Sequence, residues 1–117
     1  MSLDEDVSRK IESAWHSVED RRQAREALAT YGRESYEREP ARVRLAILQL
    51  CDGNLDALRA MVAAARRDYR DVLMWAEYPE EGRTLWAAGP NLSDEERARL
   101  DEIRARDRRQ YEKWRET

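Results

Sequence analysis

Residues 43–78 read VRLAILQLCDGNLDALRAMVAAARRDYRDVLMWAEY, and they hold the most apolar part of a very polar chain. Before the turn at residues 52–54, apolar side chains occupy nearly every position, which is typical of a helix that is buried on all sides. After the turn, apolar residues recur at steps of three and four, which places them on one helix face. The pattern predicts a central helical hairpin with arms at about 40–52 and 54–78.

A long N-terminal helix is predicted over residues 3–31. Ser2 and Glu5 have the spacing of a capping box, and apolar residues then recur with helical period. Neither glycine nor proline interrupts this pattern, which favours one helix. The alternative is two helices with a break near Ser17–Asp20, where the side chains compete for backbone hydrogen bonds.

The last third of the chain is predicted to be an ordered loop followed by a charged helix. Residues 79–91 read PEEGRTLWAAGPN, and their prolines and glycines are typical of a loop. Ser93 and Glu96 form a capping box for a C-terminal helix over residues 93–116. The sequence therefore predicts a single all-α domain over residues 1–117, arranged as an antiparallel helical bundle.

The composition disfavours several functional classes. The chain has 117 residues, is 40% charged and carries a net charge of -3, so it is no electrostatic match for nucleic acid or an anionic membrane. No apolar run reaches the ~18 residues of a membrane span, and the acidic N-terminus lacks a signal core. Cys51 is the only cysteine, so an intrachain disulfide is excluded and a cytoplasmic location is expected.

His16 is the only histidine, and Glu12 and Asp20 lie one helical turn on either side of it. An imidazole between two carboxylates can act as a general base or bind a metal. The same spacing is common by chance, so a structural or solvated His16 is favoured. The sequence also lacks a glycine-rich phosphate loop, a paired-cysteine motif and a nucleophile elbow. No metal and no cofactor are expected, and the balance leans against an enzyme.

The end of the second hairpin arm is the best candidate for chemistry, because Asp68, Asp71 and Glu77 lie there among three arginines. Carboxylates drawn into a groove between helices would have raised pKa values and would suit acid–base work. This supports an alternative function as a small carboxylate-based enzyme or ligand-binding bundle, with His16 as a further candidate. An ion-pair network with the arginines is the favoured interpretation.

A nucleic-acid-associated adaptor is a third hypothesis, because the turn at residues 52–54 joins two helices and arginines lie around the hairpin. The hypothesis fits poorly. The would-be recognition helix begins with Asp56, where a phosphate would have to be accepted, and it is longer than the usual reading helix.

Four tryptophans and five tyrosines, with no phenylalanine, are many for so short a chain. Both residue types combine a large apolar body with a polar tip and are enriched at interfaces. Trp15 and Trp75 are predicted to lie in the core, and Tyr36 to anchor the linker before the hairpin. Leu85 and Trp86 are expected to fold back onto the hairpin, with Trp86 at its edge.

The leading functional prediction is a non-enzymatic interaction module that self-associates or binds another protein. It rests on the surplus of tryptophan and tyrosine and on the thin apolar stripe of the last helix, which suits a partner surface. The predicted interface consists of Trp86, Leu100, Ile103, Tyr111 and Trp114.

Overall fold

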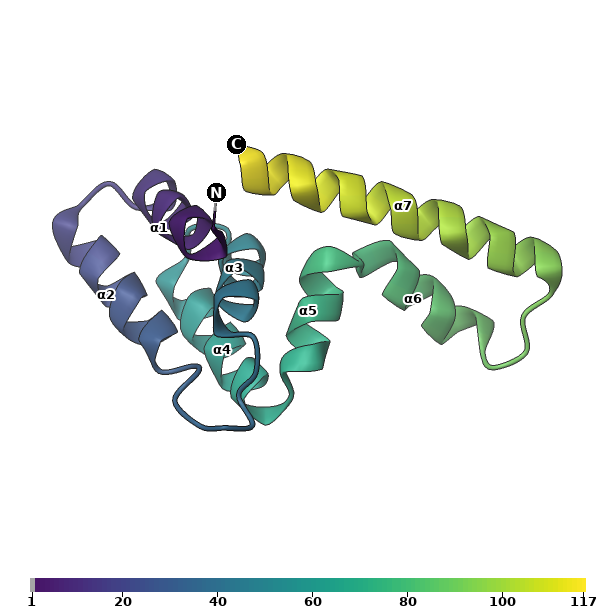
Figure 1. Ribbon diagram of the computed structural model, residues 1–117, viewed down its shortest axis with the longest axis horizontal. Coiled ribbons are helices and arrows are strands. Elements are labelled where there is room, and N and C mark those ends of the chain that lie inside the picture. Colours follow the sequence, from purple (N-terminus) through teal and green to yellow (C-terminus); the bar gives the residue numbers. More distant parts are fainter. Residues whose placement is uncertain (1) are drawn as a thin grey trace. The chain divides into compact units, whose positions relative to one another are not determined.

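The structure is a computed structural model that describes residues 2–117, and its regular secondary structure over this range is entirely helical (Figure 1). Seven helices and no strand occur over this range, so the predicted all-α class is confirmed. In chain order the helices are α1 (Leu3–Ala14), α2 (Val18–Ala29), α3 (Pro40–Cys51), α4 (Leu55–Arg67), α5 (Tyr69–Glu77), α6 (Pro79–Ala88) and α7 (Asp94–Glu116).

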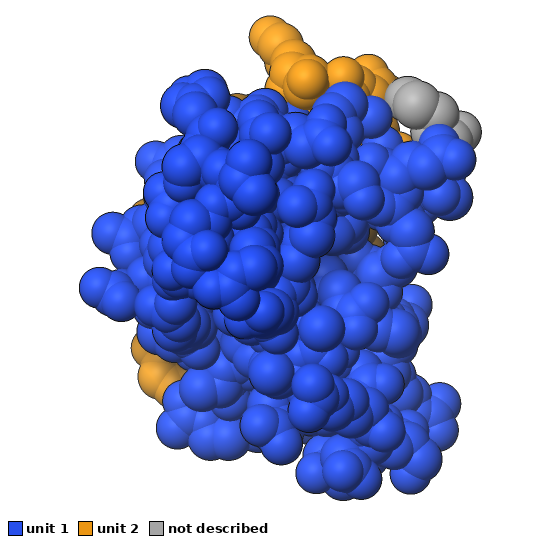
Figure 2. Space-filling view, turned by 90° about the vertical axis from the view of Figure 1, so that its left-hand side faces the viewer, with its two compact units in different colours: residues 1–73 blue, residues 74–117 orange. Residues whose placement is uncertain are grey.

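The chain divides into two compact units, Met1–Leu73 and Met74–Thr117, which are coloured separately in Figure 2. The boundary between them lies inside α5. The first unit contains α1 to α4 and the start of α5. The second contains the rest of α5 together with α6 and α7. That the whole chain folds as one domain and one antiparallel bundle stays a prediction.

The α3–α4 hairpin forms the core of the first unit. α1 packs on α3, and α2 packs on α4. The Asn54 side chain accepts a hydrogen bond from the N–H of Ala57 at 2.9 Å, so the hairpin turn ends in an N-cap for α4. Each large apolar side chain buried here contributes about 1.5–3 kcal/mol. The buried residues of the two helices include Val43, Leu45, Ala46, Ile47, Leu48, Leu58, Val62 and Ala65.

The prediction of one N-terminal helix over residues 3–31 is wrong, because residues 15–17 separate α1 from α2. Trp15 has an extended backbone, and its side chain is only 5% exposed. The Ser17 hydroxyl accepts a hydrogen bond from the N–H of Asp20 at 3.0 Å and so caps α2. Burial of Trp15 and this new cap outweigh the helical continuity that the sequence pattern indicates.

A second break divides the predicted hairpin arm at residues 54–78. α4 ends at Arg67, Asp68 has an extended backbone, and α5 begins at Tyr69. The carboxylate of Asp68 accepts the backbone N–H of Arg70 at 3.1 Å. An aspartate that binds the backbone in this way competes with continuation of the helix. The prediction of a continuous second arm is therefore wrong.

The loop predicted over residues 79–91 is mostly replaced by α6. Pro79 occupies the first position of the helix, where its missing N–H would have no partner in any case. Gly82 is a close-packing position, since a Cβ atom there would lie 3.0 Å from the Sδ atom of Met74. Pro79 and Gly82 suggest a loop in the sequence. In the structure, Pro79 begins α6 and Gly82 allows α6 to pack closely against Met74.

α7 packs against α6 within the second unit (Figure 1). The predicted capping box is confirmed: the N–H of Glu96 donates to the Ser93 hydroxyl at 3.1 Å, and the N–H of Ser93 donates to the Glu96 carboxylate at 3.2 Å. Over residues 2–117, none of the helices has both the length and the apolar character that crossing a membrane requires.

Candidate functional site

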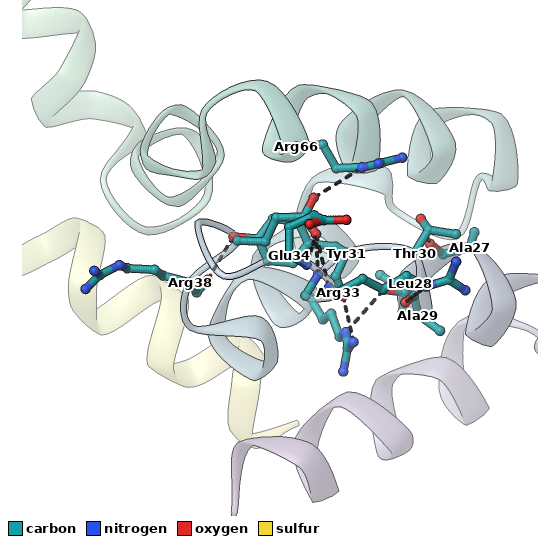
Figure 3. Close-up of polar contacts among 12 residues, drawn as sticks. Ala27, Leu28, Ala29, Thr30, Tyr31, Arg33, Glu34, Arg38 and Arg66 are labelled. Atoms are coloured by element: carbon teal, nitrogen blue, oxygen red, sulfur yellow. Dashed lines mark hydrogen bonds and ion pairs between the residues drawn. The ribbon is translucent and has the colours of Figure 1, made fainter.

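A buried carboxylate, that of Glu37, organises the loop between α2 and α3. Its Oε1 atom accepts three consecutive backbone N–H groups at 3.0–3.2 Å, those of Gly32, Arg33 and Glu34 (Figure 3). Its Oε2 atom accepts the Nε–H of Arg66, on α4, at 3.2 Å. Burial acts to raise the pKa of Glu37, but these hydrogen bonds outweigh burial and hold the pKa below its usual value. The ionised carboxylate therefore joins the loop to α4.

Tyr31 and Arg44 fix the same loop from its two ends. The Tyr31 hydroxyl donates to the carbonyl of Arg38 at 2.8 Å, and burial raises the pKa of Tyr31 to about 12. The Arg44 guanidinium donates to the carbonyls of Leu28 at 3.1 Å and Tyr31 at 2.7 Å, where α2 ends. Tyr36, which was predicted to anchor the loop, is instead 64% exposed.

A pocket of about 290 Å³ lies between this loop and the junction of α4 with α5. One of the three predicted carboxylates, that of Asp68, belongs to it, whereas Asp71 and Glu77 do not. The pocket is lined by Tyr36, Glu37, Ala65, Arg66, Arg67, Asp68, Tyr69 and Arg70.

The three candidate carboxylates do not converge on one point. The two oxygens of Asp68 accept the Nε–H and Nη2–H of Arg70 at 3.0 Å each. These hydrogen bonds hold the pKa of Asp68 below its usual range, whereas an acid–base role at neutral pH needs a raised pKa. Asp71 is exposed, and Glu77 is half-buried at the end of α5, about 9 Å of helix beyond Asp71. The geometry at Asp68 is that of an ion pair.

His16 is exposed and lies in the break between α1 and α2. The helix face expected to unite Glu12, His16 and Asp20 does not form, because it requires a continuous helix through residues 15–17. Within the described range, no group of three or more histidine, cysteine, aspartate or glutamate side chains is arranged to hold a metal ion.

Cys51 is buried on α3. Its thiol donates to the carbonyl of Leu48 at 3.4 Å, and burial raises the pKa of the thiol. A neutral, buried thiol is a poor nucleophile, so Cys51 acts as a small core side chain.

The second unit exposes apolar side chains on α5 and α6. Trp86 is 91% exposed, Met74 48% and Leu85 38%. Met74 approaches α6 at Gly82, and Leu85 and Trp86 follow Gly82 on α6 at steps of three and four residues, which places each of them next to Gly82 on the helix surface. These three residues form the α5–α6 apolar surface. Trp75 is 46% exposed, so its predicted core position is wrong. Leu85 and Trp86, which were expected to fold back onto the hairpin with Trp86 at its edge, are exposed as well.

The other predicted interface residues lie on α7 and differ in exposure. Leu100 and Tyr111 are each 8% exposed, so they offer little area to a partner. Ile103 and Trp114 are half-buried, and the rings of Tyr111 and Trp114 lie 5.5 Å apart between centroids. The interface role of these residues stays a prediction.

A second buried carboxylate, that of Asp107 on α7, joins α7 to the start of α6. Asp107 is 1% exposed, and its Oδ2 atom accepts the backbone N–H of Glu81 at 2.9 Å. The Glu81 carboxylate accepts the Nε–H of Arg104 at 2.9 Å, and the Arg104 guanidinium lies 5.7 Å from the ring centre of Tyr78. From the sequence alone, Asp107 is recognised only as a charged residue that interrupts the apolar stripe of α7.

Comparisons of the chain with protein-family models, with curated proteins and with solved structures find no match in any of the three.

Proposed function

We propose that this chain is a non-enzymatic interaction module that self-associates, with a second copy of the chain as its partner. The observation that carries the proposal is the α5–α6 apolar surface, above all Trp86, which is 91% exposed. Tryptophan buries a large apolar area when it is covered, and it is among the residues that most often dominate binding energy at interfaces. A partner that covers Trp86 would bury the apolar area of this side chain, which the fold of the chain leaves exposed.

A second copy suits this surface because an apolar patch complements itself. In a two-fold dimer the same patch on each subunit meets its equivalent. Two apolar patches are uncharged, so they do not repel each other when they meet. The chain's net charge of only -3 also keeps repulsion between copies weak once salt screens it. The same negative sign makes nucleic acid a less suitable partner.

The size of the surface predicts a weak association. A tryptophan buries about 150–250 Å², while a standard interface buries about 800 Å² on each partner. The three side chains of the α5–α6 apolar surface supply only part of that area. We therefore expect self-association in the micromolar range, with half-buried Ile103 and Trp114 as candidates for the remaining contacts.

A carboxylate-based enzyme is the weaker alternative. Asp68 is paired with Arg70 in a geometry that stabilises its ionised form, and Asp71 is exposed, so neither has the desolvated setting that acid–base chemistry needs. A cytoplasmic location, expected from the single cysteine, is part of the proposal.

Light scattering coupled to size-exclusion chromatography tests the proposal. The average mass of the wild type should rise between low and high micromolar concentration. Trp86→Ala should move this rise to higher concentration, whereas Val18→Ala should leave it in place, because Val18 is a comparably exposed apolar residue on α2 of the first unit. A monomer at every concentration contradicts self-association, and equal behaviour of the two variants contradicts the choice of surface.

A further inference from the structure

We propose that the pocket at the junction of α4 and α5 binds a small aromatic phosphate monoester. The phosphate group would be held by Arg66, Arg67 and Arg70, and the ring would lie against Tyr36 and Tyr69. This pocket belongs to the first unit, and the inference does not depend on self-association through the second.

The arginines of the pocket carry more donors than the pocket's own carboxylates use. Glu37 already accepts three backbone N–H groups, so Arg66 reaches it through Nε alone and keeps both terminal nitrogens for another acceptor. Arg70 uses Nε and Nη2 on Asp68 and keeps Nη1. Over residues 2–117, the Arg67 side chain makes no hydrogen bond or ion pair. The unused donors of these exposed arginines can bind a further anion.

The chemistry of the donors favours phosphate over carboxylate. Guanidinium groups bind oxyanions through pairs of parallel N–H bonds. A phosphate monoester brings about -1.5 to -2 charges and three strong acceptor oxygens at neutral pH. A carboxylate offers a single charge and two oxygens, which would leave part of the three-arginine set without an acceptor.

Tyr36 points to an aromatic ligand. Its side chain is 64% exposed, although the adjoining residue Glu37 is buried and accepts three backbone N–H groups of the same loop. The Tyr36 ring is thus held at the pocket without being buried in the fold, and Tyr69 lines the same pocket. A flat ring stacked on an aromatic side chain is stabilised in this setting.

The volume limits the ligand to a small molecule. At about 290 Å³, the pocket is at the lower end of the ~300–1,000 Å³ usual for ligand sites. One ring with one phosphate group fits this volume better than a dinucleotide does.

Calorimetric titration of the full chain with phenyl phosphate tests the proposal, with inorganic phosphate and benzoate as comparison ligands. Phenyl phosphate should bind at a single saturable site, about tenfold more tightly than inorganic phosphate because of the ring, and more tightly than benzoate because of the second charge. No saturable binding of phenyl phosphate, or affinity no better than that of inorganic phosphate or of benzoate, would overturn the proposal.

Three variants locate the site. Arg67→Gln should weaken phenyl phosphate binding about tenfold or more. Arg59→Gln should leave it unchanged, because Arg59 is an exposed arginine of the same helix outside the pocket. Tyr36→Ala should reduce the affinity for phenyl phosphate to that for inorganic phosphate and leave the latter unchanged. Binding that is equal in Arg67→Gln and Arg59→Gln places the ligand elsewhere and overturns the proposal.

Discussion

The carboxylate of Asp107, on α7, accepts the backbone N–H of Glu81 at 2.9 Å and so caps the first turn of α6. α6 has no side-chain cap of its own, and an N–H in its first turn has no acceptor within the helix. Asp107→Ala should therefore lower the free energy of unfolding by about 1–3 kcal/mol, because a buried donor loses its partner.

Asp107→Asn is the matched control, since its amide oxygen still accepts the Glu81 N–H. Urea denaturation followed by circular dichroism should show a smaller loss for Asn than for Ala. Equal losses in the two variants would mean that the charge of Asp107, and not this hydrogen bond, stabilises the helix pair.

Glu37 predicts a pH dependence of stability. Its pKa in the folded chain is held below the ordinary glutamate value of 4.5, so the unfolded chain binds a proton at a higher pH than the folded chain does. The stability from Glu37 is thus fully present above about pH 5 and is lost as the pH falls through the lowered folded pKa. Glu37→Gln should flatten the fall of the unfolding free energy in acid, while Glu34→Gln, an exposed neighbour, should not. If the unfolding free energy of Glu37→Gln falls with decreasing pH as steeply as that of the wild type, this role of Glu37 is contradicted.

Gly32→Ala should destabilise the fold by more than about 1 kcal/mol. Gly32 has φ +100°, a conformation that disfavours other residues, and a Cβ atom there would lie 2.8 Å from the Cβ of Pro40. Gly53→Ala separates strain from crowding, because Gly53 also has a positive φ (+76°) but its new Cβ would meet only the Ala14 carbonyl oxygen at 3.6 Å. Thermal denaturation should give the larger loss for Gly32→Ala, and the opposite order would contradict the close approach at Pro40.

Leu58→Ala should cost about 2–5 kcal/mol, because Leu58 is fully buried in the α3–α4 hairpin. Hydrogen exchange then tests whether the two compact units form the single predicted domain. In a single cooperative domain, slow-exchanging amides of α7 should lose protection together with those of α3. Unchanged protection in α7 would contradict the single-domain prediction.

The sequence predicts the first arm of the hairpin well, because the apolar run from Val43 to Cys51 is typical of a helix that is buried on all sides. It predicts helix ends poorly where no glycine or proline marks them. The breaks at Ser17 and Asp68 depend on side chains that bind the backbone and compete with helix continuation. The first break is also favoured by the burial of Trp15, which depends on packing. Likewise, Pro79 and Gly82 indicate a loop until the contact with Met74 is known.

The same limit applies to the candidate site. The cluster around Asp68 is evident from the sequence, but its pairing with Arg70 depends on geometry. The burial of Glu37 and Asp107 cannot be predicted from the sequence. In a chain that is 40% charged, the sequence around a buried acidic residue looks the same as that around an acidic residue in solvent. Their partners are backbone N–H groups, which leave no mark in the amino-acid sequence.

Sedimentation equilibrium of the wild type and Trp86→Ser, run beside their urea denaturation curves, tests the central claim most directly. Trp86 is 91% exposed, so its replacement should leave the free energy of unfolding of the monomer nearly unchanged while it weakens self-association at least about tenfold. A wild type that sediments as a monomer at high micromolar concentration, or a variant that loses stability and association in equal measure, would contradict the claim.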